Sequence, residues 1–264
     1  MSLAKVPKAP PAPPRPLGAF WKRQVEILEA DQFPADGAHH PSSAMWTKPD
    51  GTHAGKCLRA YVQRLRGVPE TDPADGESRM AMKAGNWIEY GIMSGLKRSN
   101  VAVGYQLGEK QVKVEGLRYP VSYSTDFVEK DSEGLIGRDV KTTQGYGFEK
   151  VVTMPNEGHV AQLYWYSRLS GVIRWTLEYL DRAKGGMLSH DLSFFPDSGF
   201  PVINGKRVPL FDYPALLAGW QEAERYLPGG DLNGQEPPPS YDGKGFPCFW
   251  KTRGSSVVKG CGCR

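Results

Sequence analysis

The chain has 264 residues, 39% of them hydrophobic, and a formal net charge of +4. This length fits one domain, or one domain with a small additional lobe. No apolar stretch approaches the roughly 20 residues that a membrane-spanning helix needs, so the composition excludes an integral membrane protein. The mild positive charge is compatible with binding to a phosphate backbone but does not demonstrate it. The N-terminus has no apolar leader segment, which favours a cytoplasmic location.

The chain divides into an N-terminal tail and a domain. Residues 1–18 are rich in proline and basic residues, and this composition cannot bury a core. We expect them to be disordered or polyproline-like. Residues 19–264 are expected to form a single domain. Within it, residues 51–68 are predicted to contain a helix whose apolar stripe begins at Cys57 and ends at Leu65.

A second helix is predicted from Arg79 to Ser99. Its apolar residues recur at four-residue spacing, which is typical of a helix that packs on one face: Ala84, Ile88, Ile92 and Leu96. Glu89 borders this apolar face, and a carboxylate in that position needs a partner. The partner is either a basic side chain, which is the simpler alternative, or a metal ion.

Two strands with acidic residues follow. The first, predicted over residues 121–128, contains Asp126, and the second ends in an Asp-Val-Lys tripeptide that includes Asp139 and Lys141. A polar turn over residues 129–134 joins them, which predicts an antiparallel hairpin. Successive side chains of a strand alternate between its faces, so Asp139 and Lys141 point the same way. The alternative is a surface hairpin with a few solvated charges.

The chemistry of this hairpin depends on whether a cation binds there. Two neighbouring carboxylates repel each other unless a cation lies between them, and hard oxygen ligands suit Mg²⁺ or Mn²⁺. A divalent ion can activate a bound water and stabilise charge on a phosphoryl group. Lys141 can orient the attacking water and offset charge in the transition state. The pattern therefore predicts hydrolysis of a phosphodiester.

A third helix is predicted from His159 to Leu169. Gln162 and Tyr166 are four residues apart and share one face, where they can hydrogen-bond a phosphate or hold the neighbouring strand. The alternative is an amide and a phenol that serve packing alone. His159 precedes this helix and is able to reach the site, but helix capping or exposure is the default expectation.

The last third of the chain is predicted to contain two strands and a helix. The strands are expected at Trp175–Leu180 and Leu192–Phe195. The amphipathic helix, Pro214–Leu227, has proline at its start and two glycines after its end.

Taken together, these residues resemble the PD-(D/E)XK nuclease superfamily. The matching elements follow that family's order along the chain: Glu89 on a helix, Asp126, Asp139-Val140-Lys141, and Gln162-x-x-x-Tyr166. The last element is similar to the RecB-like exonuclease branch. The resemblance covers residues 80–180, the expected catalytic core, and implies an α/β fold with a restriction-endonuclease-like mixed central β-sheet flanked by helices. Thr125 stands where the family has proline, and many RecB-like members have histidine in place of Glu89.

The resemblance implies Mg²⁺- or Mn²⁺-dependent cleavage of DNA. It assigns the metal ligands as follows: Glu89, Asp126, Asp139 and the Val140 carbonyl. It makes Lys141 the catalytic lysine, with Gln162 and Tyr166 supporting the site and the nucleic acid. The implied activity is a DNA exonuclease acting on single-stranded DNA or strand ends, with protein partners in recombination, repair or CRISPR adaptation. The alternatives are a non-catalytic DNA-binding or adaptor module on a nuclease fold, and an endonuclease of the same fold.

Four cysteines remain: Cys57, Cys248, Cys261 and Cys263. A cytosolic location disfavours disulfides. One early and three late cysteines resemble the iron–sulfur nucleases of this branch, which include the CRISPR-associated RecB-like exonucleases and the AddB-type helicase-nucleases. That resemblance implies a 4Fe-4S cluster that joins a C-terminal lobe, residues 233–264, to the Cys57 helix. Those families usually carry a Cys-x-x-Cys pair, which this chain lacks, so zinc bound by four cysteines and incidental thiols stay as alternatives.

Overall fold

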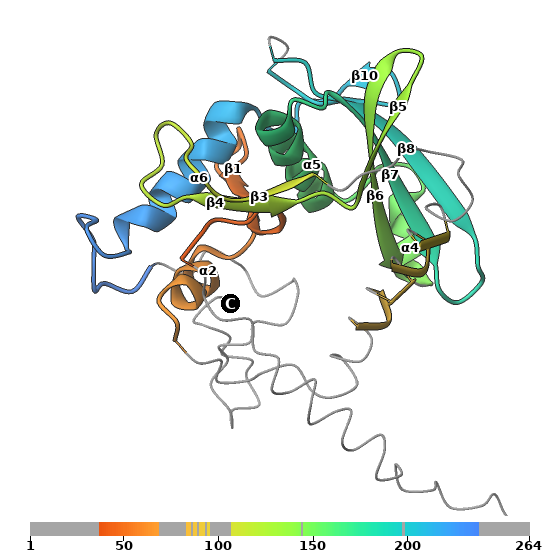
Figure 1. Ribbon diagram of the computed structural model, residues 1–264. Coiled ribbons are helices and arrows are strands. Elements are labelled where there is room, and N and C mark those ends of the chain that lie inside the picture. Colours follow the sequence, from red (N-terminus) through yellow and green to blue (C-terminus); the bar gives the residue numbers. More distant parts are fainter. Residues whose placement is uncertain are drawn as a thin grey trace, which may run out of the picture.

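The computed structural model describes residues 37–68, 83–85, 87–88, 90–92, 94–95, 107–143, 145–196 and 199–237. The described chain forms a six-stranded sheet and two two-stranded sheets with helices beside them (Figure 1). The predicted α/β class, with a mixed central sheet flanked by helices, is confirmed. The predicted N-terminal tail, Glu89 and the three late cysteines lie outside the described residues. The described residues of the predicted second helix, between 83 and 95, are helical.

The central sheet has the strand order β10-β9-β8-β7-β6-β5. Its strands are β5 (Phe127–Asp131), β6 (Gly134–Thr143), β7 (Arg174–Asp181), β8 (Met187–Ser193), β9 (Val202–Ile203) and β10 (Lys206–Arg207). Every neighbouring pair is antiparallel except β6 and β7, which are parallel. Parallel neighbours need a crossover connection. Here it contains α4 (Tyr146–Val151) and α5 (Glu157–Ser170).

The predicted hairpin is β5 and β6, with a shorter turn than expected. Asp131 pairs with Gly134, so only two residues form the turn instead of six. The predicted strand over residues 121–128 is interrupted. Its first part, β4 (Val121–Ser124), pairs with β3 (Gly108–Val112) in a separate sheet. The interruption is fixed by the buried side chain of Thr125, whose hydroxyl bonds both the N–H and the carbonyl of Leu107.

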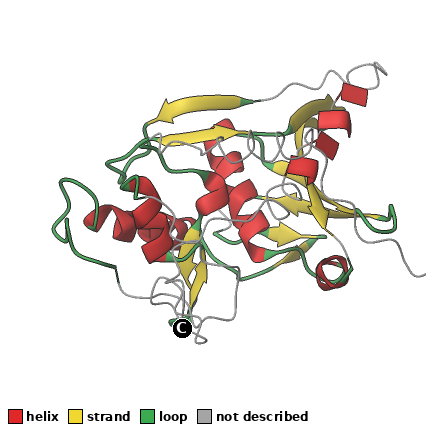
Figure 2. Ribbon diagram, turned by 90° about the horizontal axis from the view of Figure 1, so that it is seen from below, coloured by secondary structure: helices red, strands yellow, loops and turns green. Residues whose placement is uncertain are grey.

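Helix α5 lies in the middle of the molecule. It begins at the cap residue Asn156, whose side chain accepts a hydrogen bond from Gly158 N, and it ends at Gly171 in a left-handed conformation. Residues 160–167 are all buried, because the helix is covered on several sides. Figure 2 shows helices between the separate groups of strands. No described helix is long and apolar enough to cross a membrane.

The remaining named elements come before β3 or after β10 in the chain. They are the short helix η1 (Pro41–Ser43), the hairpin β1 (Met45–Thr47) and β2 (His53–Gly55), and the helices α2 (Leu58–Leu65) and α6 (Tyr213–Arg225). The helix predicted over Pro214–Leu227 is therefore confirmed, with Asp212 as its cap. Helix α6 approaches β1 closely at Gly219, where a Cβ atom would lie 2.0 Å from the Met45 carbonyl oxygen.

A buried polar cluster joins these elements around His39 and Glu224. His39 Nδ1 lies 2.6 Å from the Tyr61 hydroxyl of α2, and Nε2 lies 2.9 Å from Glu224 Oε1 of α6. The Glu224 carboxylate also accepts hydrogen bonds from the backbone N–H groups of Arg118 and Tyr119. Burial acts to raise the pKa of Glu224, but these hydrogen bonds hold it below its ordinary value. The cluster thus ties three chain segments together through one ionised carboxylate.

We predict that Glu224→Gln lowers the free energy of unfolding at pH 7 by about 1–3 kcal/mol, because an amide cannot satisfy the same buried donors. Since the pKa of Glu224 is depressed in the fold, the carboxylate stabilises the protein above its unfolded-state pKa of about 4.3. This contribution is lost as the pH falls through the folded-state pKa. The difference between the two proteins should therefore shrink in acid, as measured by urea unfolding at several pH values.

The matched control is Glu222→Gln on the same helix, where an exposed carboxylate pairs with Arg225 at 3.0 Å. Its effect should stay below about 1 kcal/mol. Equal effects of the two substitutions at pH 7 would contradict a structural role for the buried cluster.

Candidate active site

The two predicted aspartates lie opposite each other at one end of the β5–β6 hairpin. Phe127 pairs with Arg138, so Asp126, one residue before β5, is opposite Asp139. Directly opposite residues of an antiparallel pair have their side chains on the same face and close together. Asp126 Oδ2 also accepts a hydrogen bond of 3.0 Å from Val140 N, which holds this carboxylate against β6.

Asp139 is a fully buried ionisable group beside a lysine. Its side chain is 0% exposed, and its Oδ2 lies 2.7 Å from Lys141 Nζ. The other carboxylate oxygen, Oδ1, has no hydrogen-bond partner among the described residues. Burial raises the pKa of Asp139 to about 7, with Asp126 acting in the same direction and Lys141 in the opposite one. Lys141 alone therefore does not compensate the buried carboxylate.

Lys141 carries the positive charge of the site. Burial by itself lowers the pKa of this ammonium group, but Asp139 and Asp126 raise it above its ordinary value. The side chain is 22% exposed, and the raised pKa keeps the ammonium charged. On the neighbouring parallel strand, Tyr179 pairs in register with Lys141.

One face of α5 places a row of polar side chains over these strands. His159, Gln162 and Tyr166 are spaced by three and four residues, so they share a face of the helix. Gln162 Nε2 donates a 2.7 Å hydrogen bond to the Tyr166 hydroxyl, as expected for two side chains on one face of the helix. Burial, together with the nearby Asp139, raises the pKa of Tyr166, so the phenol keeps its proton.

His159 differs from its prediction, because it neither caps α5 nor is exposed. Asn156 is the cap, and the half-buried His159 ring places Nδ1 2.9 Å from the Tyr179 hydroxyl. Burial lowers the pKa of His159 to about 3, and the charges of Lys141 and Lys56 act in the same direction. The imidazole is therefore neutral at physiological pH.

Tyr179 and Lys56 were missed by the sequence analysis. Tyr179 belongs to the alternating buried residues of β7, but only the parallel β6–β7 register places it beside Lys141. Lys56 follows β2 directly. The hairpin of β1 and β2 is tied to the first turn of α5 by an ion pair of 2.8 Å between Lys48 and Glu157.

The described carboxylates fit part of a divalent-metal site. Asp126 and Asp139 supply oxygen ligands of the type that Mg²⁺ and Mn²⁺ prefer, and the buried Oδ1 of Asp139 has no hydrogen-bond partner among the described residues. Within the described ranges, no three His, Cys, Asp or Glu side chains form a group that could hold a metal ion. The third predicted carboxylate, Glu89, lies outside those ranges.

Cys57 is the N-cap residue of α2 and is half-buried. The predicted apolar stripe is confirmed by the buried side chains that follow it, Leu58, Tyr61 and Val62. The last described segment of the chain lies along the same helix. Arg59 Nε donates to the Pro237 carbonyl at 2.6 Å, and Arg66 donates to the Gln235 carbonyl at 2.7 Å.

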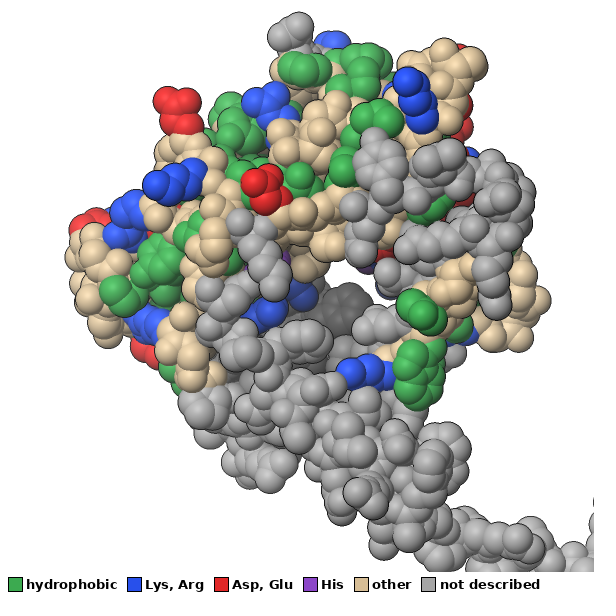
Figure 3. Space-filling model, in the orientation of Figure 1, with side chains coloured by type: hydrophobic (Ala, Val, Ile, Leu, Met, Phe, Trp, Pro, Cys, Tyr) green, Lys and Arg blue, Asp and Glu red, His purple; other side chains and the backbone are tan. Residues whose placement is uncertain are grey.

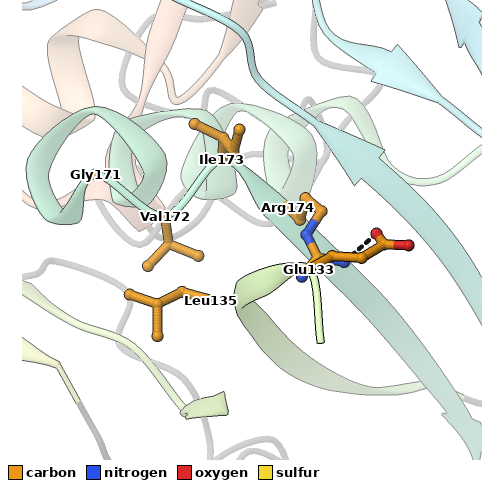
Figure 4. Close-up of a pocket in the computed structure, with 6 residues that line it drawn as sticks. All are labelled: Glu133, Leu135, Gly171, Val172, Ile173 and Arg174. Carbon is orange, nitrogen blue, oxygen red and sulfur yellow. Dashed lines mark hydrogen bonds and ion pairs between the residues drawn. The ribbon is translucent and has the colours of Figure 1, made fainter. Parts of the chain in front are cut away.

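A separate hollow lies at the other end of the β5–β6 hairpin (Figure 4). Arg174, the first residue of β7, pairs there with Glu133 at 2.8 Å beside the apolar side chains of Leu135 and Val172. Its charged side chains already compensate each other, and none of the predicted site residues lines it. We therefore place the candidate active site at the Asp139 end of the strands.

The chain was compared with known proteins. No protein-family model matches it, and no curated protein matches it. Among solved structures it is similar to one titled "Crystal structure of SSO0001", with 15% sequence identity, a TM-score of 0.43, and coverage of 67% of this chain and 77% of that chain. A similarity this distant carries no argument about activity.

Proposed function

We propose that the protein is a metal-dependent DNA exonuclease. The observation that carries this proposal is the fully buried Asp139 carboxylate, which lies opposite Asp126 and beside the Lys141 ammonium. Burial and Asp126 raise the pKa of Asp139 to about 7 despite Lys141, and strongly perturbed carboxylates cluster at functional sites. A divalent cation is the compensation that fits two facing carboxylates.

In this proposal the carboxylates bind the metal ion and Lys141 donates hydrogen bonds to the reacting groups. Asp126 and Asp139 would hold Mg²⁺ or Mn²⁺, with Glu89 and the Val140 carbonyl as the further ligands that the family resemblance implies. The metal would supply Lewis-acid stabilisation of the phosphoryl group and a water of lowered pKa. The charged Lys141 ammonium is held 2.7 Å from Asp139, where it can donate hydrogen bonds to the attacking water or to a phosphate oxygen.

The polar side chains on one face of α5, which are His159, Gln162 and Tyr166, complete the proposed site. The Gln162–Tyr166 hydrogen bond fixes both side chains beside the carboxylates, and the neutral His159 adds no competing positive charge. In Figure 3, Lys or Arg side chains are visible on this face of the described part of the molecule, with Asp or Glu side chains among them. The net charge of +4 is compatible with a polyanionic substrate. The preference for single strands or strand ends rests on the resemblance to the iron–sulfur RecB-like nucleases.

We predict that Lys141→Ala lowers the rate of digestion of end-labelled single-stranded DNA with Mn²⁺ by about 100-fold or more, because a preorganised donor to the reacting group is lost. Lys130→Ala, an exposed lysine on the same hairpin, should retain the wild-type rate. Release of labelled mononucleotides identifies an exonuclease, and cleavage of circular single strands identifies an endonuclease.

Equal digestion by wild type and Lys141→Ala would contradict the catalytic assignment. DNA binding without digestion by any of the three proteins would support a non-catalytic binding module instead.

We further propose that Cys57 binds a 4Fe-4S cluster together with Cys248, Cys261 and Cys263. Two observations support it: the half-buried Cys57 is the N-cap residue of α2, and the segment that ends at Pro237 is hydrogen-bonded to that helix. A cluster bound by four thiolates would then join α2 to the C-terminal part of the chain.

We predict that anaerobically purified protein contains about four iron atoms per chain. Cys57→Ser should lose this iron and unfold at a lower temperature, whereas Ala60→Ser on the same helix should keep it. Iron and zinc are measured together by mass spectrometry. Zinc without iron would indicate a four-cysteine zinc site, and neither metal would indicate incidental thiols, so both outcomes contradict the cluster.

A further inference from the structure

A groove runs between η1 and the β3–β4 ribbon and ends at Tyr166. Ser42 lines one wall, Ser124 and Tyr123 line the other, and Glu109 lies on β3. Figure 1 shows this ribbon crossing in front of α5. We call it the Tyr123 groove. Its volume of about 550 Å³ is in the range of small-molecule sites, roughly 300–1,000 Å³.

Tyr166 belongs both to this groove and to the candidate active site. Its hydroxyl accepts the hydrogen bond from Gln162, which lies one turn earlier on α5. Its ring lies 6.2 Å from the ring of Tyr123, measured between centroids. A molecule in the groove would therefore lie next to the residues proposed to act on the phosphodiester.

The side chains that line the Tyr123 groove indicate which part of a nucleotide it can bind. Among the described residues, the groove is lined by serine hydroxyls, two tyrosine rings and the His40 imidazole, with no lysine or arginine, and Glu109 adds a negative charge. A phosphate would be repelled by that carboxylate. An aromatic ring can stack on a base, and hydroxyl groups can donate to or accept from any base or sugar. The groove thus suits the neutral part of a nucleotide.

We propose that the Tyr123 groove binds the base and sugar of the nucleotide next to the scissile phosphate, taken from a single strand. This inference rests on the proposed nuclease function. A paired and stacked base cannot enter such a groove, so the strand must be single or its end must open. Because hydroxyls serve as donors and acceptors alike, all four bases are accepted.

The test narrows the groove from opposite walls with Ser42→Trp and Ser124→Trp, both at exposed positions, with Ser42→Ala as the matched control. Binding of a fluorescein-labelled single-stranded oligothymidylate is measured by anisotropy. Hydrolysis of bis(p-nitrophenyl) phosphate with Mn²⁺ is measured in parallel, because this diester has neither base nor sugar. Circular dichroism verifies that each variant is folded.

The tryptophan variants should raise the Kd for the oligonucleotide about tenfold, which is the scale of one lost base stack. Ser42→Ala should stay within about twofold of wild type, as surface changes usually do. The rate on the small diester should be unchanged in all variants.

Three results would overturn the groove as a base site. The first is an unchanged oligonucleotide Kd in both tryptophan variants, and the second is a loss of diester hydrolysis in the same variants that lose oligonucleotide binding. The third is that the tryptophan variants weaken binding of double-stranded DNA by the same factor as binding of the single strand. Groove-dependent binding without hydrolysis of either substrate by wild type would overturn the nuclease proposal and leave the base-binding site standing. Absence of oligonucleotide binding by wild type would overturn both.

Discussion

Burial of the Asp139 carboxylate opposite a second carboxylate is the constraint on which the rest of the site depends. The β5–β6 register brings Asp126 and Asp139 face to face, and the short turn of the hairpin leaves no freedom to separate them. The Lys141 ammonium offsets part of the negative charge of the two carboxylates, and these carboxylates raise the pKa of Lys141. Because burial and Asp126 still raise the pKa of Asp139 beside Lys141, a divalent cation between the two carboxylates would complete the compensation, and this supports the catalytic role that we propose.

The surrounding fold holds this arrangement rigid. Helix α5 is buried on nearly all sides, so the His159, Gln162 and Tyr166 row has a fixed position over the strands. The cluster of His39 and Glu224 anchors the segment that continues directly into η1, and η1 forms one wall of the Tyr123 groove. A contact that stabilises the fold therefore also positions the surface proposed to receive the substrate.

The sequence predicted the parts of the site that depend on local patterns. Strand alternation placed Asp139 and Lys141 on one face, helical spacing paired Gln162 with Tyr166, and the capping signals located α6. It did not predict the parts that depend on the order of strands. Tyr179 reaches Lys141 only through the parallel β6–β7 register, and the break at Thr125 follows from its bonds to Leu107. The neutral His159 also depends on burial and on charges from distant segments.

The most direct measurement is a titration of the protein with Mn²⁺, followed by the electron paramagnetic resonance signal of the free ion. Because the pKa of Asp139 is raised to about 7, its carboxyl must lose a proton to bind the ion, and affinity should rise as the pH increases from 6 to 8. Asp139→Asn should abolish this binding. Asp131→Asn, which changes an exposed aspartate at the far end of the same hairpin, should retain it. Equal Mn²⁺ binding by the two variants, or none by wild type, would contradict the central claim that the buried aspartate pair is a divalent-cation site.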